Sequence, residues 1–122
     1  MAYFLAVYTM KPESLAGFYA RSKAEQDAID AEGLPKWEAW EQRNAQALVN
    51  RGGMVGKTLR VSKAAIAPAS NDFCGYVVVE AETIEAAADL FRDHPHFSVF
   101  PGDTVDLMPF LAGPDLENKP AR

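Results

Sequence analysis

The amino-acid sequence predicts an α+β fold with the split β-α-β arrangement. The first observation is the order of the expected elements, which is strand, helix, helix, strand, strand, helix, strand. The second is that two of the strands are apolar almost throughout, whereas the other two mix polar and apolar residues. Continuously apolar strands are covered on both faces and lie inside a sheet, while mixed strands suit its edges. We therefore expect a four-stranded sheet with the first and third strands side by side and parallel at its centre.

The two central strands are expected at residues 2–9 (AYFLAVYT) and 76–79 (YVVV), which are rich in β-branched and aromatic residues. The edge strands are expected at residues 54–62 (MVGKTLRVS) and 104–110 (TVDLMPF). Lysine and arginine in the first of these segments, and Pro109 in the second, are typical of edge strands.

Three helices are predicted from apolar residues at helical spacing, at about residues 14–31, 35–51 and 83–94. Gly33 and Pro35 are expected to separate the first two helices, and the Gly-Gly pair at 52–53 to stop the second. Thr83 is expected to cap the third helix and Pro95 to end it. The helix before residue 31 is an extra N-terminal element relative to the split β-α-β plan.

Composition narrows the classes of partner. The 122 residues predict one domain, residues 1–114, followed by a polar tail at 115–122. A formal net charge of −5 without a basic cluster argues against nucleic acid as a partner. No apolar run reaches the ~20 residues of a membrane helix, and the N-terminus has no signal-peptide pattern, so a cytoplasmic protein is expected. Cys74 is the single cysteine, which argues against a disulfide or a zinc site.

One helix layer can cover only one face of the predicted sheet. Central strands that are apolar on both faces would then expose a large patch on a soluble monomer. A two-fold homodimer with the sheets packed face to face buries that patch, so we expect the chain to associate with itself.

The segment 75–114 (GYVVVEAETIEAAADLFRDHPHFSVFPGDTVDLMPFLAGP) resembles the YCII-related family, and so does the upstream WEAWEQRNAQALVNRGG at 37–53. The resemblance covers residues 1–114 and implies a ferredoxin-like α+β subunit that pairs into a dimeric α/β barrel. It also implies a small-molecule enzyme with a His and an Asp in its pocket. In this chain the helix at 35–51 has no histidine, and the family's Asp-Pro position is His94-Pro95, so His94 alone is carried over by position.

The densest group of polar residues is Asp93-His94-Pro95-His96. Imidazole can take up and release a proton near neutral pH, and a nearby carboxylate orients it and stabilises its charged form. We predict His94 as the catalytic acid/base, with Asp106 and Glu80 from the strands as catalytic carboxylates. Asp93, adjacent in the sequence, is an alternative partner for His94.

His96 and Asp93, together with Tyr76 and Ser70, are predicted to bind the substrate. Ser70 belongs to residues 64–71, expected to connect the second and third strands, and connectors often border pockets. The structural alternatives stay open: His94 closing a helix near its C-terminal carbonyls, and Glu80 and Asp106 as solvated residues at strand ends. Two histidines alone do not make a metal site, and no cofactor is predicted.

The sequence thus predicts a YCII-like protein that acts on a small carbonyl or aromatic molecule by cofactor-independent proton transfer, with His94 as the acid/base in a pocket inside the dimeric barrel. The enzyme class stays open between lyase, isomerase and hydrolase. One alternative is a non-catalytic dimer that binds a metabolite or serves as an accessory to another protein. Another, a monooxygenase or isomerase of the wider barrel group, depends on fold analogy alone.

Overall fold

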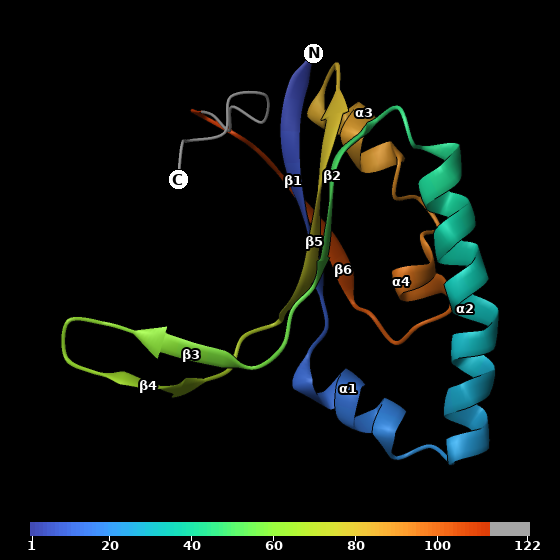
Figure 1. Ribbon diagram of the computed structural model, residues 1–122, viewed down its shortest axis with the longest axis vertical. Helices are drawn as coiled ribbons and strands as arrows, with labels where there is room; N and C mark the ends of the chain where they lie inside the picture. The colour runs from blue at the N-terminus through green and yellow to red at the C-terminus, as the bar shows by residue number, and fades with distance from the viewer. Residues whose placement is uncertain (113–122) are drawn as a thin grey trace, which may run out of the picture.

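A four-stranded antiparallel sheet lies at the centre of the protein, and the helices cover one of its faces (Figure 1). The computed structural model describes residues 1–112, so the tail predicted at 115–122 lies outside the described residues. The strands are β1 (Ala2–Thr9), β2 (Leu48–Met54), β3 (Thr58–Val61), β4 (Ile66–Ala69), β5 (Phe73–Ala81) and β6 (Thr104–Pro109). The helices are α1 (Pro12–Tyr19), α2 (Lys23–Arg43), α3 (Ile84–Asp89) and α4 (Pro95–Ser98).

The strands of the main sheet have the order β2-β5-β1-β6. The two predicted central strands, β1 and β5, are therefore adjacent, and β6 lies at an edge as expected. Their predicted parallel pairing is wrong, because β5 runs antiparallel to β1 and also to β2. The reason is topological: a helical connection leaves β2 parallel to β1, and the following turn then reverses the chain into β5.

Helix α2 is continuous through Gly33 and Pro35, where the sequence predicted a break. The break lies earlier, at Ser22, whose hydroxyl accepts a hydrogen bond from the backbone N–H of Glu25 at 3.1 Å. Gly33 serves close packing instead, since a Cβ placed there would lie 2.4 Å from the Phe100 ring. The helix ends at Arg43, so the predicted helix at 35–51 is too long at its C-terminal end.

The third predicted helix divides in two. Thr83 caps α3 as expected, accepting a hydrogen bond from the backbone N–H of Ala86 at 3.1 Å. Helix α3 ends at Asp89, and Pro95 begins α4 instead of ending a helix. Proline suits a first helical position because that N–H has no partner within the helix.

Strands β3 and β4 form a projecting hairpin where the sequence predicted one strand and a connector. Strand β3 pairs with β4 as a separate two-stranded sheet. Figure 1 shows this hairpin extending from the end of β2, on the side of the main sheet that has no helices. The edge strand predicted at 54–62 is therefore misplaced: the edge strand of the main sheet is β2, which ends at Met54, and the predicted segment mostly forms β3.

The core lies between the helix-bearing face of the sheet and the helices. Its buried members come from β1, β5, α2 and the α3 region: Phe4, Ala6, Tyr8, Trp40, Val77, Val79, Ala81, Ala87 and Phe91. The indole N–H of Trp40 donates to the carbonyl of Leu90 at 2.7 Å and so ties α2 to the end of α3. No helix within residues 1–112 has the length and apolar character needed to cross a bilayer.

Strand β2 contains a β-bulge at the Gly-Gly pair that the sequence assigned to a helix end. The pairing with β5 shifts between Leu48 and Asn50 and again between Asn50 and Gly53, and each shift leaves one extra residue on β2. Gly52 has a φ of +60° and donates its N–H to the Asn50 side chain at 2.7 Å. Bulges redirect side chains, and this one sets the direction of Arg51.

Substitution of the two glycines by alanine tests whether the left-handed backbone at Gly52 matters for stability. Gly52→Ala forces a left-handed alanine whose Cβ would lie 1.9 Å from the Tyr76 carbonyl oxygen, whereas a Cβ at Gly53 meets nothing within 4 Å. We expect Gly52→Ala to lower the free energy of unfolding by about 1–3 kcal/mol or more, and Gly53→Ala to change it little. Urea denaturation of both variants is the measurement. Equal stabilities would contradict this account of the bulge.

Candidate functional site

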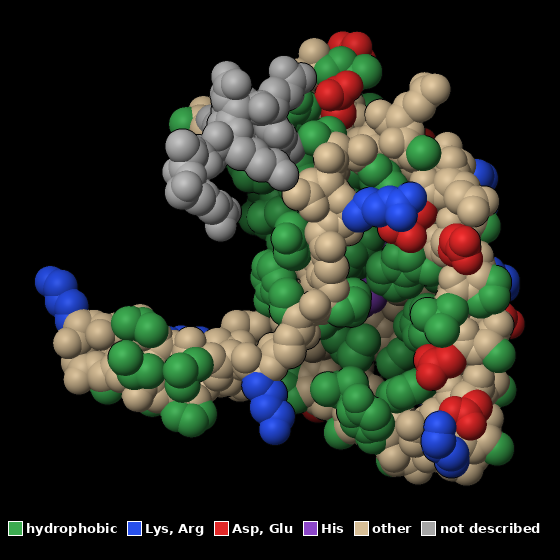
Figure 2. Space-filling view, in the orientation of Figure 1, with side chains coloured by type: hydrophobic (Ala, Val, Ile, Leu, Met, Phe, Trp, Pro, Cys, Tyr) green, Lys and Arg blue, Asp and Glu red, His purple; other side chains and the backbone are tan. Residues whose placement is uncertain are grey.

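A cavity of about 570 Å³ lies between α2 and the sheet. Figure 2 shows the hollow as a recess of hydrophobic side chains, with histidine visible inside. Nine residues line it: Met10, Leu34, Trp37, Glu38, Glu41, Arg51, Met54, His96 and Phe100. A volume of this size, with mostly apolar walls and a few polar groups, is typical of small-molecule sites.

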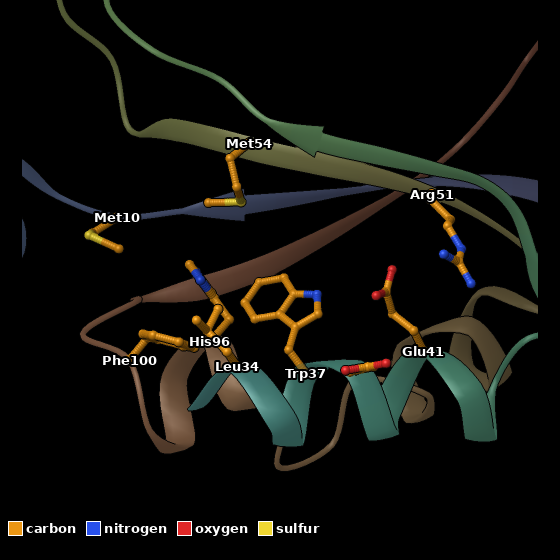
Figure 3. A pocket seen from close by; sticks show the side chains of 9 residues that line it. Met10, Leu34, Trp37, Glu41, Arg51, Met54, His96 and Phe100 are labelled. Carbon is orange, nitrogen blue, oxygen red and sulfur yellow. The ribbon is translucent and has the colours of Figure 1, made fainter. Parts of the chain in front are cut away.

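One end of the cavity carries opposite charges. Figure 3 shows Glu41 on α2 and Arg51 on β2 pointing toward each other. Among the ion pairs within 4.0 Å that residues 1–112 form, none involves either side chain. A smaller adjoining hollow of about 210 Å³ is also lined by both residues, together with Trp37. A carboxylate and a guanidinium are thus both available to a ligand beside an indole ring.

The other end of the cavity contains His96 and Phe100, with Met10 nearby (Figure 3). His96 is 1% exposed, and its Nε2 lies 2.8 Å from the carbonyl oxygen of Thr9. Because a carbonyl only accepts, Nε2 carries the proton and Nδ1 is the unprotonated nitrogen of the neutral ring. The backbone of Gly102 packs so closely on this ring that a Cβ there would lie 2.3 Å from it.

His94 lies behind the cavity in an aromatic box, with no exposed surface. The ring centroids of Trp37 and Trp40 are each 4.5 Å from that of His94, and those of Tyr8 and Phe91 are at 5.3 and 5.7 Å. Its Nδ1 accepts the backbone N–H of His96 at 2.9 Å and thereby caps α4. Its Nε2 then carries the proton and faces the Tyr8 hydroxyl at the long distance of 3.5 Å.

Burial keeps both histidines neutral. It lowers the pKa of His94 to about 3, with a smaller contribution from the neighbouring His96. Burial also lowers the pKa of His96, against the opposing effect of its hydrogen bonds with the Thr9 and Thr104 carbonyls. It raises the pKa of the Tyr8 hydroxyl well above its ordinary value, and the charge of Glu41 acts in the same direction. The cavity therefore has a neutral, hydrogen-bonding end and a charged end.

No known protein-family description matches the chain, and no similar protein was found among curated sequences. Among solved structures, the chain is similar to 5-chloro-2-hydroxyhydroquinone dehydrochlorinase from Burkholderia phenoliruptrix AC1100, in complex with 2,5-dihydroxybenzoquinone. The TM-score is 0.53 at 13% sequence identity, over 91% of this chain and 95% of that one. The two proteins share a fold. At this identity the likeness says nothing about a shared reaction, and membership of the YCII-related family stays a prediction.

The predicted catalytic residues do not come together in the subunit. His94 is absent from the cavity lining, because it is enclosed by the aromatic box. Glu80 pairs with Tyr3 and Asp106 pairs with Val7, on the face of the sheet opposite the helices. These two carboxylates are thus separated from His94 by the sheet itself, and the expected acid/base pairing does not form within one chain.

Of the four predicted substrate-binding residues, His96 lines the main cavity and Tyr76 borders the smaller hollow. Asp93 is exposed, with a φ of 59°, and lies outside both. Ser70 follows the hairpin and borders a separate surface depression beside β4. Residues 1–112 contain no group of three or more His, Cys, Asp or Glu side chains arranged to hold a metal ion.

Sequence reasoning missed Glu41 and Arg51. A signal for Glu41 was present, since Leu34, Trp37 and Glu41 recur at helical spacing, and a carboxylate on the apolar stripe of a helix is unusual. No such signal marked Arg51. Its segment was expected to be a helix, whereas Arg51 lies in the irregular part of β2, where the register against β5 shifts, and it lines the cavity.

The buried neutral histidines make stability depend on pH. A histidine that is neutral when folded, with a pKa near 6.5 when unfolded, costs stability as the pH falls below that value. For His94 the loss continues toward the folded pKa of about 3. We expect the free energy of unfolding to fall by up to about 1.4 kcal/mol per pH unit below about pH 6.5 because of His94, with a further loss in the same direction from His96. Urea denaturation between about pH 7 and about pH 5, above the range where most carboxylates titrate, measures the slope. A flat profile would show that neither imidazole is neutral because of burial.

Proposed function

We propose that the chain is an enzyme that acts on a small ring compound by cofactor-independent proton transfer, in the cavity between α2 and the sheet. The observation that carries this proposal is the placement of Glu41 and Arg51 at one end of an aromatic cavity, with His96 at the other (Figure 3). The resemblance to the YCII-related family points in the same direction. The molecule bound by the fold neighbour, 2,5-dihydroxybenzoquinone, is also a small ring compound.

In this proposal the ring of the substrate packs against Trp37. Glu41 accepts a proton from a ring carbon next to a carbonyl or enol, and later returns it. The negative charge then moves onto the substrate oxygen, where the guanidinium of Arg51 stabilises it. His96 hydrogen-bonds the far side of the ring as a neutral imidazole. Such a reaction is an isomerisation, because the proton returns to the substrate and no group leaves, and it needs no electron carrier.

In this proposal Glu41, and not the predicted His94, is the catalytic acid/base. The His94 ring has no exposed surface, and its Nδ1 is already occupied as the cap of α4. His94 acts instead as a positioning residue, since it holds the backbone N–H of His96 and one side of Trp37. Its protonation would break the cap, because a protonated Nδ1 would face an N–H donor.

A non-catalytic binding protein is the second candidate. The observation in its favour is that the His96 Nε2 is held by the Thr9 carbonyl, which leaves fewer groups for chemistry. The cavity would then bind a ring compound and release it unchanged. A monooxygenase-like or isomerase-like activity of the wider fold group has no specific residue in this cavity to support it.

The homodimer also belongs to this proposal, as does a cytoplasmic location. The helix-free face of the sheet carries the side chains of Leu5 and Met108, the latter 43% exposed. A second copy packed on this face would cover them. The cavity lies on the other face of the sheet, so each subunit would keep its own site.

2,5-Dihydroxybenzoquinone is a suitable first probe because each of its C–H ring carbons lies between an enol and a carbonyl group, can take up a deuteron from an acid and then loses the original proton to a base. We expect the protein to bind it and to accelerate exchange of these protons in D₂O, followed by proton NMR. Glu41→Gln should slow the exchange about 10²-fold or more, and Arg51→Gln should weaken binding about tenfold.

Glu32→Gln is the matched control, because Glu32 lies on the same helix, is 59% exposed and pairs only weakly with Lys36 at 3.9 Å. It should leave both the rate of proton exchange and the affinity for 2,5-dihydroxybenzoquinone unchanged. Saturable binding without accelerated exchange would favour the non-catalytic alternative. Equal effects of the Glu41 and Glu32 substitutions would remove Glu41 from the mechanism.

A further inference from the structure

The β3–β4 hairpin has one strongly apolar face. In its register Leu59 pairs with Pro68 and Val61 with Ile66, so these four side chains share a face. Leu59, Val61 and Ile66 are 64%, 72% and 66% exposed. Figure 2 shows hydrophobic side chains gathered on the hairpin, away from the body of the protein. Within residues 1–112, β3 and β4 pair only with each other, and an isolated two-stranded hairpin is marginally stable in water.

The hairpin is also the basic part of an acidic chain. Residues 56–71 contain Lys57, Arg60 and Lys63 and no acidic residue. The remaining nine basic and seventeen acidic residues leave the rest of the chain at a formal charge of −8. Lys57 precedes β3 and Lys63 lies in the turn, so a positive charge stands at each end of the apolar face. Arg60 alternates to the opposite face.

The helix-free face of the sheet has the complementary pattern. Its centre is apolar: Leu5 on β1 pairs with Val78, which is 5% exposed, and with Met108, which is 43% exposed. Its two carboxylates, Glu80 and Asp106, belong to the strands on either side of β1 and pair with β1 residues four positions apart. No ion pair within 4.0 Å formed by residues 1–112 includes either carboxylate. An apolar centre bordered by negative charges thus faces the side toward which the hairpin projects (Figure 1).

We propose that the β3–β4 hairpin is an arm that docks on the helix-free sheet face of a second copy of this chain, with Lys57 and Lys63 directed to Glu80 and Asp106 of that copy. This inference rests on the proposed homodimer and adds the segment that holds it together. Charge complementarity selects a second copy, because the partner surface must be acidic and apolar and the chain itself offers such a surface. It also gives Glu80 and Asp106 a role in association, since neither carboxylate lies on the cavity side of its own sheet.

Charge reversal in the full-length chain tests the arm. The double variant Lys57→Glu with Lys63→Glu places like charges opposite each other and should raise the dimer dissociation constant about tenfold or more. Arg60→Glu makes the same kind of charge change on the opposite face of the same hairpin and should alter it little. Sedimentation equilibrium over a range of protein concentrations gives the constants. High salt should weaken the wild-type dimer in the same assay.

Glu80→Lys with Asp106→Lys, combined with the double lysine reversal, should restore association. Far-ultraviolet circular dichroism and urea midpoints check that each variant is folded, as expected for exposed positions. A wild-type protein that stays monomeric at all concentrations would overturn both the arm and the homodimer. A dimer that withstands the lysine reversal as well as it withstands Arg60→Glu would overturn the arm alone.

Discussion

The hydrogen bond from the His96 backbone N–H to the His94 imidazole is the interaction on which the site depends. It caps α4 at 2.9 Å inside a box of aromatic rings, and it can form only while His94 is neutral. The same short helix then carries His96 to the end of the cavity, and the box fixes Trp37 as its wall. A residue type usually associated with proton transfer thus serves as a structural acceptor. Burial determines this, because the desolvation that lowers its pKa also removes it from contact with a ligand.

The second constraint is the bulge in β2. A regular strand would alternate Arg51 with its neighbours in register with β5, whereas the extra residue and the left-handed Gly52 break that alternation. Arg51 therefore faces α2 and Glu41, although it belongs to an edge strand. The charged end of the cavity thus combines Glu41 from a regular helix with Arg51 from the irregular part of β2.

The sequence was informative where hydrophobic pattern alone decides structure. Continuous apolar runs identified β1 and β5 as neighbours at the centre, and Thr83 identified the start of α3. The sequence was misleading where one residue type can occupy two kinds of structural position. Gly33 permits close packing against Phe100, and Pro95 opens a helix, although both types often mark helix ends. The site was harder still, because the placement of Glu41 and Arg51 at the same end of the cavity depends on a bulge and on the register of distant strands, neither of which leaves a local pattern.

The period of two along β1 explains why the two faces of the sheet have different partners. Tyr8 points to the helices and contributes to the aromatic box, whereas its neighbour Val7 lies on the helix-free face beside Asp106. Polar groups on the first face line the cavity beside α2, and those on the second face lie at the margins of an apolar area that includes Val7 and Val78. Carboxylates on the two faces of the sheet therefore have different environments. Glu41 lies against a half-buried indole, where a nearby charge acts strongly on a ligand. Glu80 and Asp106 face outward, where they suit attraction over distance to a basic segment such as the hairpin.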